Sequence, residues 1–347
     1  MLQNFEHVRI HSSVGISGKK SLDVEAFALQ HNLNIKKVHR FIKHMGFKSI
    51  RVVEKPLTVS DMCVTGGQYL LQSAGMDPLE IDALIVVTQS PDFLVPATSY
   101  GMQERLSLRN DVLMMDLTQG CSGWVYGLFY ASTLIELKIC RNVLLCTGDL
   151  TFHEDIPISS DDNISRLTLG DGACVTLLSY SEEKVLSSFS IRTNGEKHSV
   201  IKNDSSGCRF YRYSKNNDCP SGMETDGVAF AEYALEVVPE ELYKLLSKNN
   251  LQLSDLSYFL VHQSNKNLLQ SLALVLGMPV EFVPFLAGNT GNTSSATIPL
   301  ALSENLSNLP DVFKSRKTAL CGVGVGLSCV TALVDLTSTK IFPAIYM

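Results

Sequence analysis

The strongest constraint on the fold is an internal repeat. Residues 69–90 and 243–264 align without a gap, so the two segments lie 174 positions apart (243 − 69). In each segment, a helical pattern of apolar residues leads through a turn into a short apolar run that is typical of a buried strand. The runs end in VTQS at 87–90 and VHQS at 261–264. A unit that recurs after about half of a 347-residue chain predicts two similar halves.

Two more pairs of segments keep nearly the same offset. The triplet at 120–122 (GCS) corresponds to the triplet at 291–293 (GNT), and each precedes an apolar helical stretch. The apolar run at 143–148 corresponds to the run at 318–322. Chance similarity between generic βα units explains one such pair, but three pairs in the same order favour a duplication.

We therefore predict an α/β protein with an N-terminal half at residues 1–180 and a C-terminal half at 181–347. Helices alternating with buried strands favour mostly parallel sheets covered by helices. Ligands then bind at the carboxyl ends of the strands. The polar stretch at 193–222, rich in Gly, Ser and Asn, predicts a long loop or cap between the halves.

The composition argues against several classes of protein. Apolar residues make up 45 % of the chain and charged residues 18 %, which indicates a folded core rather than disorder. A net charge of −6 is unfavourable for binding nucleic acid. The N-terminus lacks the apolar segment of a signal peptide, and no uncharged apolar run reaches the ~18 residues that span a bilayer. We expect a cytoplasmic protein with no nucleic-acid or membrane partner.

Nine cysteines occur, none in a CxxC pair, and we expect most of them to be core residues in a reducing compartment, with no metal site. Cys121 is the exception. A strand ends near Asp116, the turn GCSG follows at 120–123, and a long apolar helix begins. The helix dipole and unpaired N–H groups stabilise a reactive thiolate at such a position. A structural cysteine buried in a tight turn is the alternative.

His262 and Asn292 lie at comparable positions in the second half. His262 follows the apolar run 258–261, and Asn292 lies in the turn before a helix. An imidazole can donate a hydrogen bond to a thioester oxygen or exchange a proton near neutral pH, and an amide can donate to the same oxygen. The alternatives are a core histidine with satisfied hydrogen bonds and a turn at 290–295 that caps a helix. If the halves meet at their strand ends, both residues converge on Cys121.

Glycines at 322, 324 and 326 lie between two apolar strands. A dinucleotide-binding motif requires a helix after its glycines, so this sequence is not one. A glycine turn at 322–324 would let a backbone N–H approach a developing oxyanion, and a plain β-turn or bulge is the alternative.

Residues 36–51 carry six Lys and Arg residues and no acid. Such runs usually form the solvated face of a helix. In a protein of net charge −6, the patch can also bind the phosphates of coenzyme A or an acidic carrier protein.

Together these segments resemble β-ketoacyl-acyl carrier protein synthase III, within the thiolase-like superfamily. The similarity runs from about residue 35 to the C-terminus and includes DLTQGCSGWVYGL, METDGVAFAEYALEVVP, LVHQSN, GNTGNTSSATIPLAL and CGVGVGLS. The resemblance implies a five-layer α-β-α-β-α fold and a homodimer. It also implies coenzyme A or phosphopantetheine thioesters as substrates, with no separate cofactor.

The resemblance further implies a two-stage reaction in fatty acid or polyketide synthesis. An acyl group moves from coenzyme A or an acyl carrier protein onto Cys121, and a malonyl thioester then loses carbon dioxide and attacks that acyl group. His262 and Asn292 would hold the malonyl thioester oxygen. The N–H of Cys121 and an N–H of the 322–324 turn, Val323 by register, would form the oxyanion hole.

The chain departs from the family at its substrate-binding positions. The family's Trp-Ile-x-x-Arg-Thr-Gly motif reads RFIKHMG at 40–46, with no Trp to stack on adenine and with His44 in place of the Arg. Asn267 replaces an Arg of the carrier-binding region. Asn265, which corresponds to the residue that contacts pantetheine in the family, is retained. These changes weaken the case for coenzyme A as the acyl donor. They leave an acyl carrier protein as the donor that we expect. The candidate substrate contacts are Arg40, Lys43, Asn265 and Lys266.

Val95 replaces the bulky Phe that the family often has at the end of its acyl pocket, near the dimer interface. A smaller side chain lengthens the pocket, so we predict a primer longer than acetyl.

Two other functions stay open. In the first, Cys121 passes its acyl group to an alcohol or amine, which makes the protein a non-condensing acyltransferase with His262 as general base. In the second, the chain is a non-catalytic subunit of a heterodimer, which would not need an intact Cys, His and Asn.

Overall fold

Two β-sheets form the frame of the structure, a computed structural model that describes residues 1–152, 166–203, 207–208, 223–309 and 317–347. The first sheet has six strands, which in spatial order are β15 (Lys340–Tyr346), β2 (Val8–Ser17), β8 (Gly172–Tyr180), β7 (Asn142–Asp149), β5 (Ala83–Val87) and β6 (Leu113–Leu117). The second sheet has five, which are β1 (Leu2–Phe5), β9 (Ser187–Thr193), β14 (Ser328–Val334), β13 (Thr318–Gly324) and β12 (Phe259–Val261).

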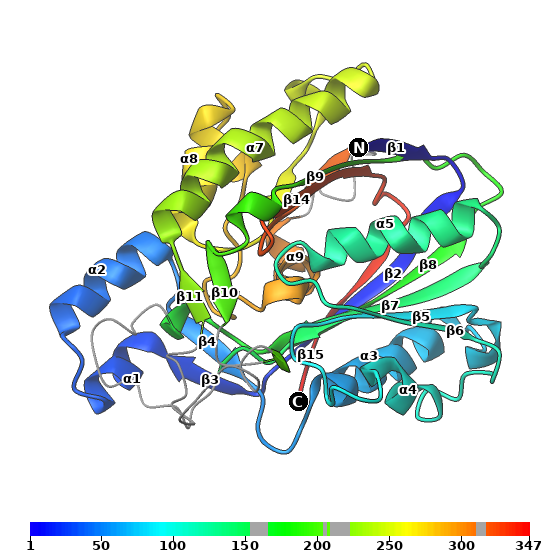
Figure 1. Cartoon of the computed structure of the whole chain (residues 1–347), viewed down its shortest axis with the longest axis horizontal. Helices are drawn as coiled ribbons and strands as arrows, with labels where there is room; N and C mark the ends of the chain where they lie inside the picture. The colour runs from blue at the N-terminus through cyan, green and yellow to red at the C-terminus, as the bar shows by residue number, and fades with distance from the viewer. Residues whose placement is uncertain (153–165, 204–206, 209–222, 310–316) are drawn as a thin grey trace.

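Helices cover both outer faces of this frame and also fill the space between the sheets (Figure 1). The outer layer of the first sheet is α3 (Val59–Ala74) with α4 (Thr98–Gln103), and that of the second sheet is α7 (Gly227–Lys248) with α8 (Lys266–Val275). The central layer is α5 (Gly123–Glu136) with α9 (Thr297–Glu304). The expected five-layer α-β-α-β-α fold is therefore confirmed.

The central helix α5 shows why the sequence requires this arrangement. A helix that is apolar on every side must be buried on every side, and α5 contacts β5 and β7 of the first sheet and β13 and β14 of the second. Strands β5 and β7 are buried along their whole length, so they lack the alternation of a strand with one solvated face. Each large apolar side chain buried here contributes about 1.5–3 kcal/mol.

The expectation of mostly parallel sheets is wrong, because both sheets are mixed. The βα units give the parallel pairs β5–β6, β5–β7 and β12–β13. The next neighbours are antiparallel, as β8 runs against β7 and β14 runs against β13. Strand β14 follows β13 after a turn of three residues, 325–327, and so short a connection only permits antiparallel pairing.

The repeat seen in the sequence is also a repeat of structure. In the first half, α3 leads through the short 3-10 helix η1 (Pro78–Glu80) into β5. In the second half, α7 leads through η4 (Leu253–Asp255) into β12. Both 3-10 helices begin with a capping box, and β5 and β12 each have a parallel neighbour followed by an antiparallel one.

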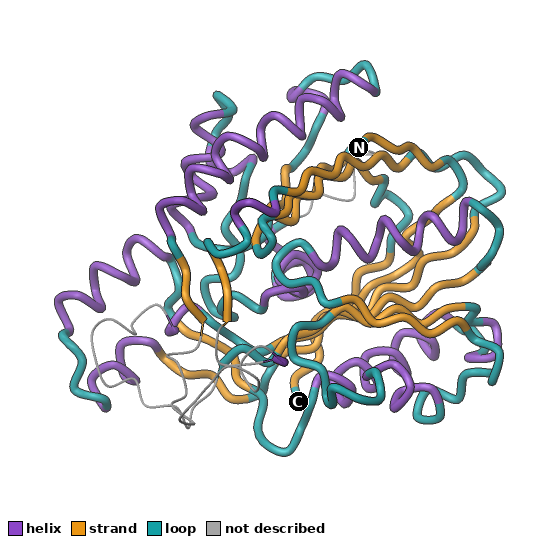
Figure 2. The backbone as a smooth tube through the Cα atoms, in the orientation of Figure 1, coloured by secondary structure: helices purple, strands orange, loops and turns teal. Residues whose placement is uncertain are grey.

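The terminal strands cross between the halves. Strand β1 pairs with β9 at the edge of the second sheet, and β15 pairs with β2 at the edge of the first (Figure 2). The N-terminal ammonium donates to the Ile191 carbonyl at 2.8 Å, and the Lys19 N–H donates to the Met347 carbonyl at 2.6 Å. A division at 180/181 thus separates the repeats but not the two sheets.

Smaller elements lie beside the sheets at the end where α2 is seen in Figure 1. Of the expected loop or cap at 193–222, the structure describes 193–203 and 207–208, and this part contains the 3-10 helix η3 and a strand rather than only loop. The rest of that range lies outside the described residues. The elements are α1 (Val24–Gln30), α2 (Ile35–Met45), η3 (Gly195–Lys197), and two strand pairs, β3 (Lys20–Asp23) with β4 (Ser49–Val52) and β10 (Ile201–Asn203) with β11 (Met223–Thr225).

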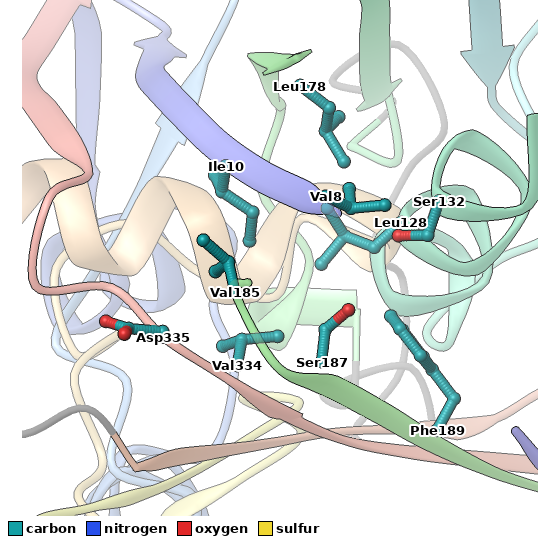
Figure 3. Close-up of a pocket in the computed structure, with 10 residues that line it drawn as sticks. All are labelled: Val8, Ile10, Leu128, Ser132, Leu178, Val185, Ser187, Phe189, Val334 and Asp335. Carbon is teal, nitrogen blue, oxygen red and sulfur yellow. The ribbon is translucent and has the colours of Figure 1, made fainter. Parts of the chain in front are cut away.

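A small apolar cavity lies between α5, β2 and the second sheet (Figure 3). Its volume is about 10 Å³, the space of roughly one water molecule. Val8, Leu128 and Phe189 are among its walls, while Cys121 and His262 are not. The cavity is a packing defect of the core and not the candidate site.

The described residues contain neither a membrane-spanning helix nor a cluster of metal-binding side chains. None of their helices is long and apolar enough to cross a bilayer. The same part of the chain holds no group of three or more His, Cys, Asp and Glu side chains placed to bind a metal ion.

Candidate active site

Cys121 lies in the connection between β6 and α5, where it is in direct contact with strand β13 of the second sheet. A Cβ added to Gly324, the last residue of β13, would lie 2.3 Å from the Cys121 Cβ and 2.8 Å from its Sγ. Gly322 is equally close to Ser122, with 2.5 Å between the added Cβ and the Ser122 Cα. Only glycine allows this approach, which explains the glycines of the sequence in terms of the cysteine they contact.

His262 follows β12, the parallel neighbour of β13. Its backbone N–H donates to the Cys321 carbonyl at 2.8 Å, which fixes the residue just past the carboxyl end of β12 and beside the middle of β13. The side chain is buried, and Nδ1 lies 2.7 Å from the Thr297 hydroxyl. The other ring nitrogen, Nε2, is buried and has no hydrogen-bond partner among the described residues. A buried polar atom without a partner is available to form a hydrogen bond with a ligand.

Asn292 is held by the first half of the chain. Its N–H donates to the Thr168 carbonyl at 2.6 Å, and its own carbonyl accepts from the Gly170 N–H at 3.1 Å. The side-chain Oδ1 accepts from the Ser294 N–H at 2.9 Å, so Asn292 does cap the following turn. That bond uses only the oxygen of the amide, and the Nδ2 donor is left for another group.

The segment 292–297 links the surroundings of the three residues. It contains the 3-10 helix η6 (Ser294–Ala296), which packs against the turn around the cysteine. A Cβ on Gly123 would lie 2.9 Å from the Ser295 Cβ, and one on Gly120 would lie 3.3 Å from the Ser294 Oγ. The same segment begins at Asn292 and ends at the Thr297 hydroxyl on His262. One short stretch of chain therefore includes Asn292, packs against the turn around Cys121 and contacts His262.

The expected thiolate at Cys121 is not the resting state. Burial, with a smaller contribution from the negative charge of Asp149, raises the pKa of this thiol from 9.0 to about 11, although part of the residue is exposed. The N–H groups of Val325 and of Cys121 itself lower the pKa, as predicted for a turn before a helix, but they do not outweigh the loss of water. Burial also lowers the pKa of His262 to about 3. At neutral pH, the site therefore holds a thiol and a neutral imidazole.

Alkylation of Cys121 by iodoacetamide should follow this pKa, because only the thiolate reacts quickly. We expect the rate to rise about tenfold per pH unit from pH 7 to pH 10 without a plateau, since this range lies below a pKa of about 11. Peptide mass spectrometry of the modified residue gives the rate, with Cys121→Ser as the blank. A plateau that begins near pH 7 would show a preformed thiolate and contradict the prediction.

The backbone donor at the sulfur is Val325, not Val323. Strand β13 continues through Gly324, and Val323 is paired opposite Cys329 in the β13–β14 ladder. The turn of this hairpin is therefore 325–327 instead of the expected 322–324. The Val325 N–H bonds to the Cys121 sulfur. Sequence register missed this shift because glycines at 322 and 324 are required by contact with the cysteine segment rather than by a turn.

The basic residues named for substrate binding come from two helices that pack together, α2 and α8. The Asn267 Nδ2 and the His44 Nδ1 are 3.2 Å apart, so the two positions that depart from the family motif meet. Asn265 is the N-cap of α8, where its Oδ1 accepts from the Leu268 N–H at 2.9 Å. Arg40, Lys43 and Lys266 are exposed on this surface, as are Lys36 and Lys37 of α2.

Val95 lies in the connection between β5 and α4 and is 86 % exposed. Its side chain is therefore not packed against the site of its own chain. Phe93 and Leu94 beside it are also exposed, so the connection presents a run of apolar side chains to the outside.

Two polar residues of the site were not singled out from the sequence. Asp149, at the end of β7, accepts from the Gln89 N–H at 2.6 Å and from the Ser295 N–H at 3.0 Å, so it joins the first half to η6. Thr297 contacts His262, as described above. Asp149 follows the apolar run 143–148 directly, and a carboxylate at a buried strand end was a usable signal.

Known proteins share this architecture. Residues 115–195 match the family described as 3-oxoacyl-[acyl-carrier-protein (ACP)] synthase III, and residues 246–336 match its C-terminal part. The β-ketoacyl-[acyl-carrier-protein] synthase III of Ehrlichia canis (strain Jake) is 30 % identical over 297 residues, which cover 85 % of this chain and 89 % of the relative.

Solved structures agree with the sequence matches. The 3-oxoacyl-(acyl-carrier protein) synthase of Burkholderia xenovorans LB400 has a TM-score of 0.89 at 27 % identity, covering 100 % of this chain and 99 % of that one. OleA of Xanthomonas campestris, with a TM-score of 0.81 at 19 % identity over 96 % and 98 % of the two chains, has the same fold. The chain therefore belongs to the β-ketoacyl-acyl carrier protein synthase III family and is an acyl-transferring ketosynthase with a thiolase-like fold.

Proposed function

We propose that Cys121 carries the acyl group of a decarboxylative Claisen condensation. In the first stage, its sulfur attacks an acyl thioester, the donor's carbon–sulfur bond breaks, and the donor thiol leaves with the proton. In the second stage, a malonyl thioester loses carbon dioxide and the bonding electrons form an enolate. The enolate carbon attacks the Cys121 thioester, its carbon–sulfur bond breaks, the sulfur leaves as a thiolate that takes a proton from water, and a β-ketoacyl thioester is released. No metal or prosthetic group takes part in these steps.

The observation that supports this assignment best is the buried, unpartnered Nε2 of His262 beside the cysteine segment. We assign His262 and the Nδ2 of Asn292 to the malonyl thioester oxygen, where negative charge grows as carbon dioxide leaves. Donors fixed in advance, away from water, are most effective there. The N–H groups of Cys121 and Val325 already lie at the sulfur, and we assign them to the oxyanion formed when the Cys121 thioester is attacked.

For the donor, we propose a thioester of phosphopantetheine on an acyl carrier protein, with coenzyme A as the second choice. The cations of α2 and α8 form an exposed surface that an acidic partner would match. The free amide donor of Asn265 at the start of α8 is our candidate contact to the pantetheine arm. We place the enzyme in the cytoplasm, in fatty acid or polyketide synthesis.

We further propose a homodimer built on β6. This strand is at an open edge of the first sheet, and its Leu113 is 40 % exposed. An uncovered edge with apolar side chains pairs readily with another strand. The exposed apolar connection at 93–95 follows the adjacent strand β5, so the same contact can cover it.

Val95 is expected to set the length of the acyl primer through this dimer. With Val at the end of the pocket, octanoyl donors should load Cys121 faster than acetyl donors. Val95→Phe should reverse the order, because the ring takes up the space of several methylene groups. Competition between the two donors, read as the mass added to Cys121, measures the preference. A strong preference of the unmodified enzyme for acetyl would refute the prediction.

The acyltransferase alternative shares the first stage and differs in the second. One experiment separates the two functions. The enzyme is loaded with an acyl thioester, the adduct is located by mass spectrometry, and malonyl thioester is then added. Carbon dioxide release with a β-keto product supports condensation. An adduct that resists malonyl thioester but transfers to an amine or alcohol supports the acyltransferase, and the lack of any adduct supports a non-catalytic subunit.

A further inference from the structure

The Thr297 hydroxyl has few possible partners. Thr297 is the first residue of α9, and its side chain is buried. Its Oγ1 lies 2.7 Å from the Nδ1 of His262 and 3.5 Å from the backbone nitrogen of Gln263. These are the two hydrogen-bond contacts of this oxygen within the described part of the chain.

The directions of these two bonds follow from the proton count. The Gln263 N–H can only donate, so Oγ1 is its acceptor. The oxygen keeps a second lone pair, but Nδ1 is the one group among the described residues that can accept the single hydroxyl proton, so only a bond directed at Nδ1 satisfies that buried proton. Because the ring is neutral at pH 7.5, it carries one proton. If Nδ1 accepts a hydrogen bond, that proton is on Nε2.

We propose that Thr297 is a positioning residue that holds His262 as the Nε2–H tautomer, so that the imidazole acts as a hydrogen-bond donor to the substrate and not as a base. This inference rests on the proposed function, which supplies the malonyl thioester oxygen as the acceptor. In the resting enzyme, the N–H at Nε2 is buried and has no partner in the described part of the chain, and a substrate oxygen would satisfy it.

The tautomer separates the two candidate reactions. A general base at Nε2 needs a free lone pair on that nitrogen, and the acyltransferase would require this form. A donor at Nε2 needs the proton there, and decarboxylation would require this form, because the thioester oxygen becomes negative. A hydroxyl on the far side of the ring thus selects between condensation and simple acyl transfer.

The tautomer can be measured directly by ¹⁵N NMR of the intact enzyme labelled at the histidine side chains. Subtraction of the His262→Gln spectrum assigns the two ring nitrogens. We expect the proton on Nε2 and an unprotonated Nδ1 in the unmodified enzyme and in Thr297→Ser, which keeps the hydroxyl. In Thr297→Val the signals should shift toward a mixture of tautomers. A proton on Nδ1 in the unmodified enzyme would overturn the proposal.

Kinetics supply the second test. Thr297→Val should load acyl groups onto Cys121 at the normal rate, while kcat for malonyl condensation falls about tenfold, the effect of one hydrogen bond. Thr297→Ser should restore kcat. Thr339→Val is the matched control. It also removes a buried 2.7 Å hydrogen bond of a threonine hydroxyl, here to the Ile10 carbonyl, but at a position away from the site. Equal effects of Thr297→Val and Thr339→Val on condensation would show a structural role only and overturn the proposal.

These readouts distinguish failure of the inference from failure of the proposed function. An enzyme with the Nε2–H tautomer but no Cys121 adduct would refute the function and leave the role of Thr297 on the ring intact. An enzyme that condenses normally with the proton on Nδ1 would refute the inference alone. If Thr297→Val does not fold, the unmodified enzyme and Thr297→Ser still decide the tautomer.

Discussion

Cys121→Ser is expected to lower acyl loading by roughly 10⁴-fold or more. A serine hydroxyl requires a base to become a nucleophile, and His262 cannot accept its proton at neutral pH because burial lowers the pKa of that imidazole to about 3. The substitution keeps the size of the side chain, so the close contact with Gly324 is preserved. Loading is measured as the mass added after incubation with an acyl thioester.

The control for this result is Cys208→Ser, since Cys208 is exposed and belongs to no group of the site. It should load as the unmodified enzyme does. Persistent loading of Cys121→Ser on another cysteine would remove Cys121 from its assigned role.

Removal of the donors at the malonyl thioester should stop the second stage and spare the first. For His262→Ala and for Asn292→Asp, we expect condensation to fall by about 100- to 1,000-fold each, while acyl loading stays within a few fold. Aspartate is chosen because its oxygen can still accept from the Ser294 N–H, which isolates the loss of the amide donor from the loss of the turn. The acyl-enzyme should therefore accumulate when malonyl thioester is present.

Single-turnover release of labelled carbon dioxide from malonyl thioester measures this stage. His198→Ala, at an exposed histidine whose Nδ1 lies 3.2 Å from the Gly195 carbonyl, serves as the control and should condense normally. If His262→Ala also abolished loading, the imidazole would be acting on Cys121 itself, as the acyltransferase alternative requires.

Much of the site could be predicted because its residues follow buried strands, and the ends of such strands can be recognised in the sequence. The apolar runs before His262 and before Cys121 locate both residues at the carboxyl edges of sheets, and the repeat indicates that the two edges face each other. The mixed pairing was not predictable in the same way. Strand β8 looks like any buried strand, and its direction depends on which strands lie beside it in space.

The protonation state of Cys121 could not be predicted from the sequence, for a different reason. Local sequence gives the turn and the helix start, which favour a thiolate. The net effect depends on how much water the folded chain removes, and here burial together with Asp149 determines the direction of the pKa shift. The same applies to Val325, since the end of β13 is set by its pairing with β14 and by contact with the cysteine.

The exchange of terminal strands has a consequence for how this enzyme can be taken apart. A chain severed after residue 180 leaves the leading fragment with β1 but without β15, its partner for β2, while the trailing fragment keeps β15 and lacks β1. Each fragment would have one terminal strand without its pairing partner and one sheet edge that had lost its outermost strand.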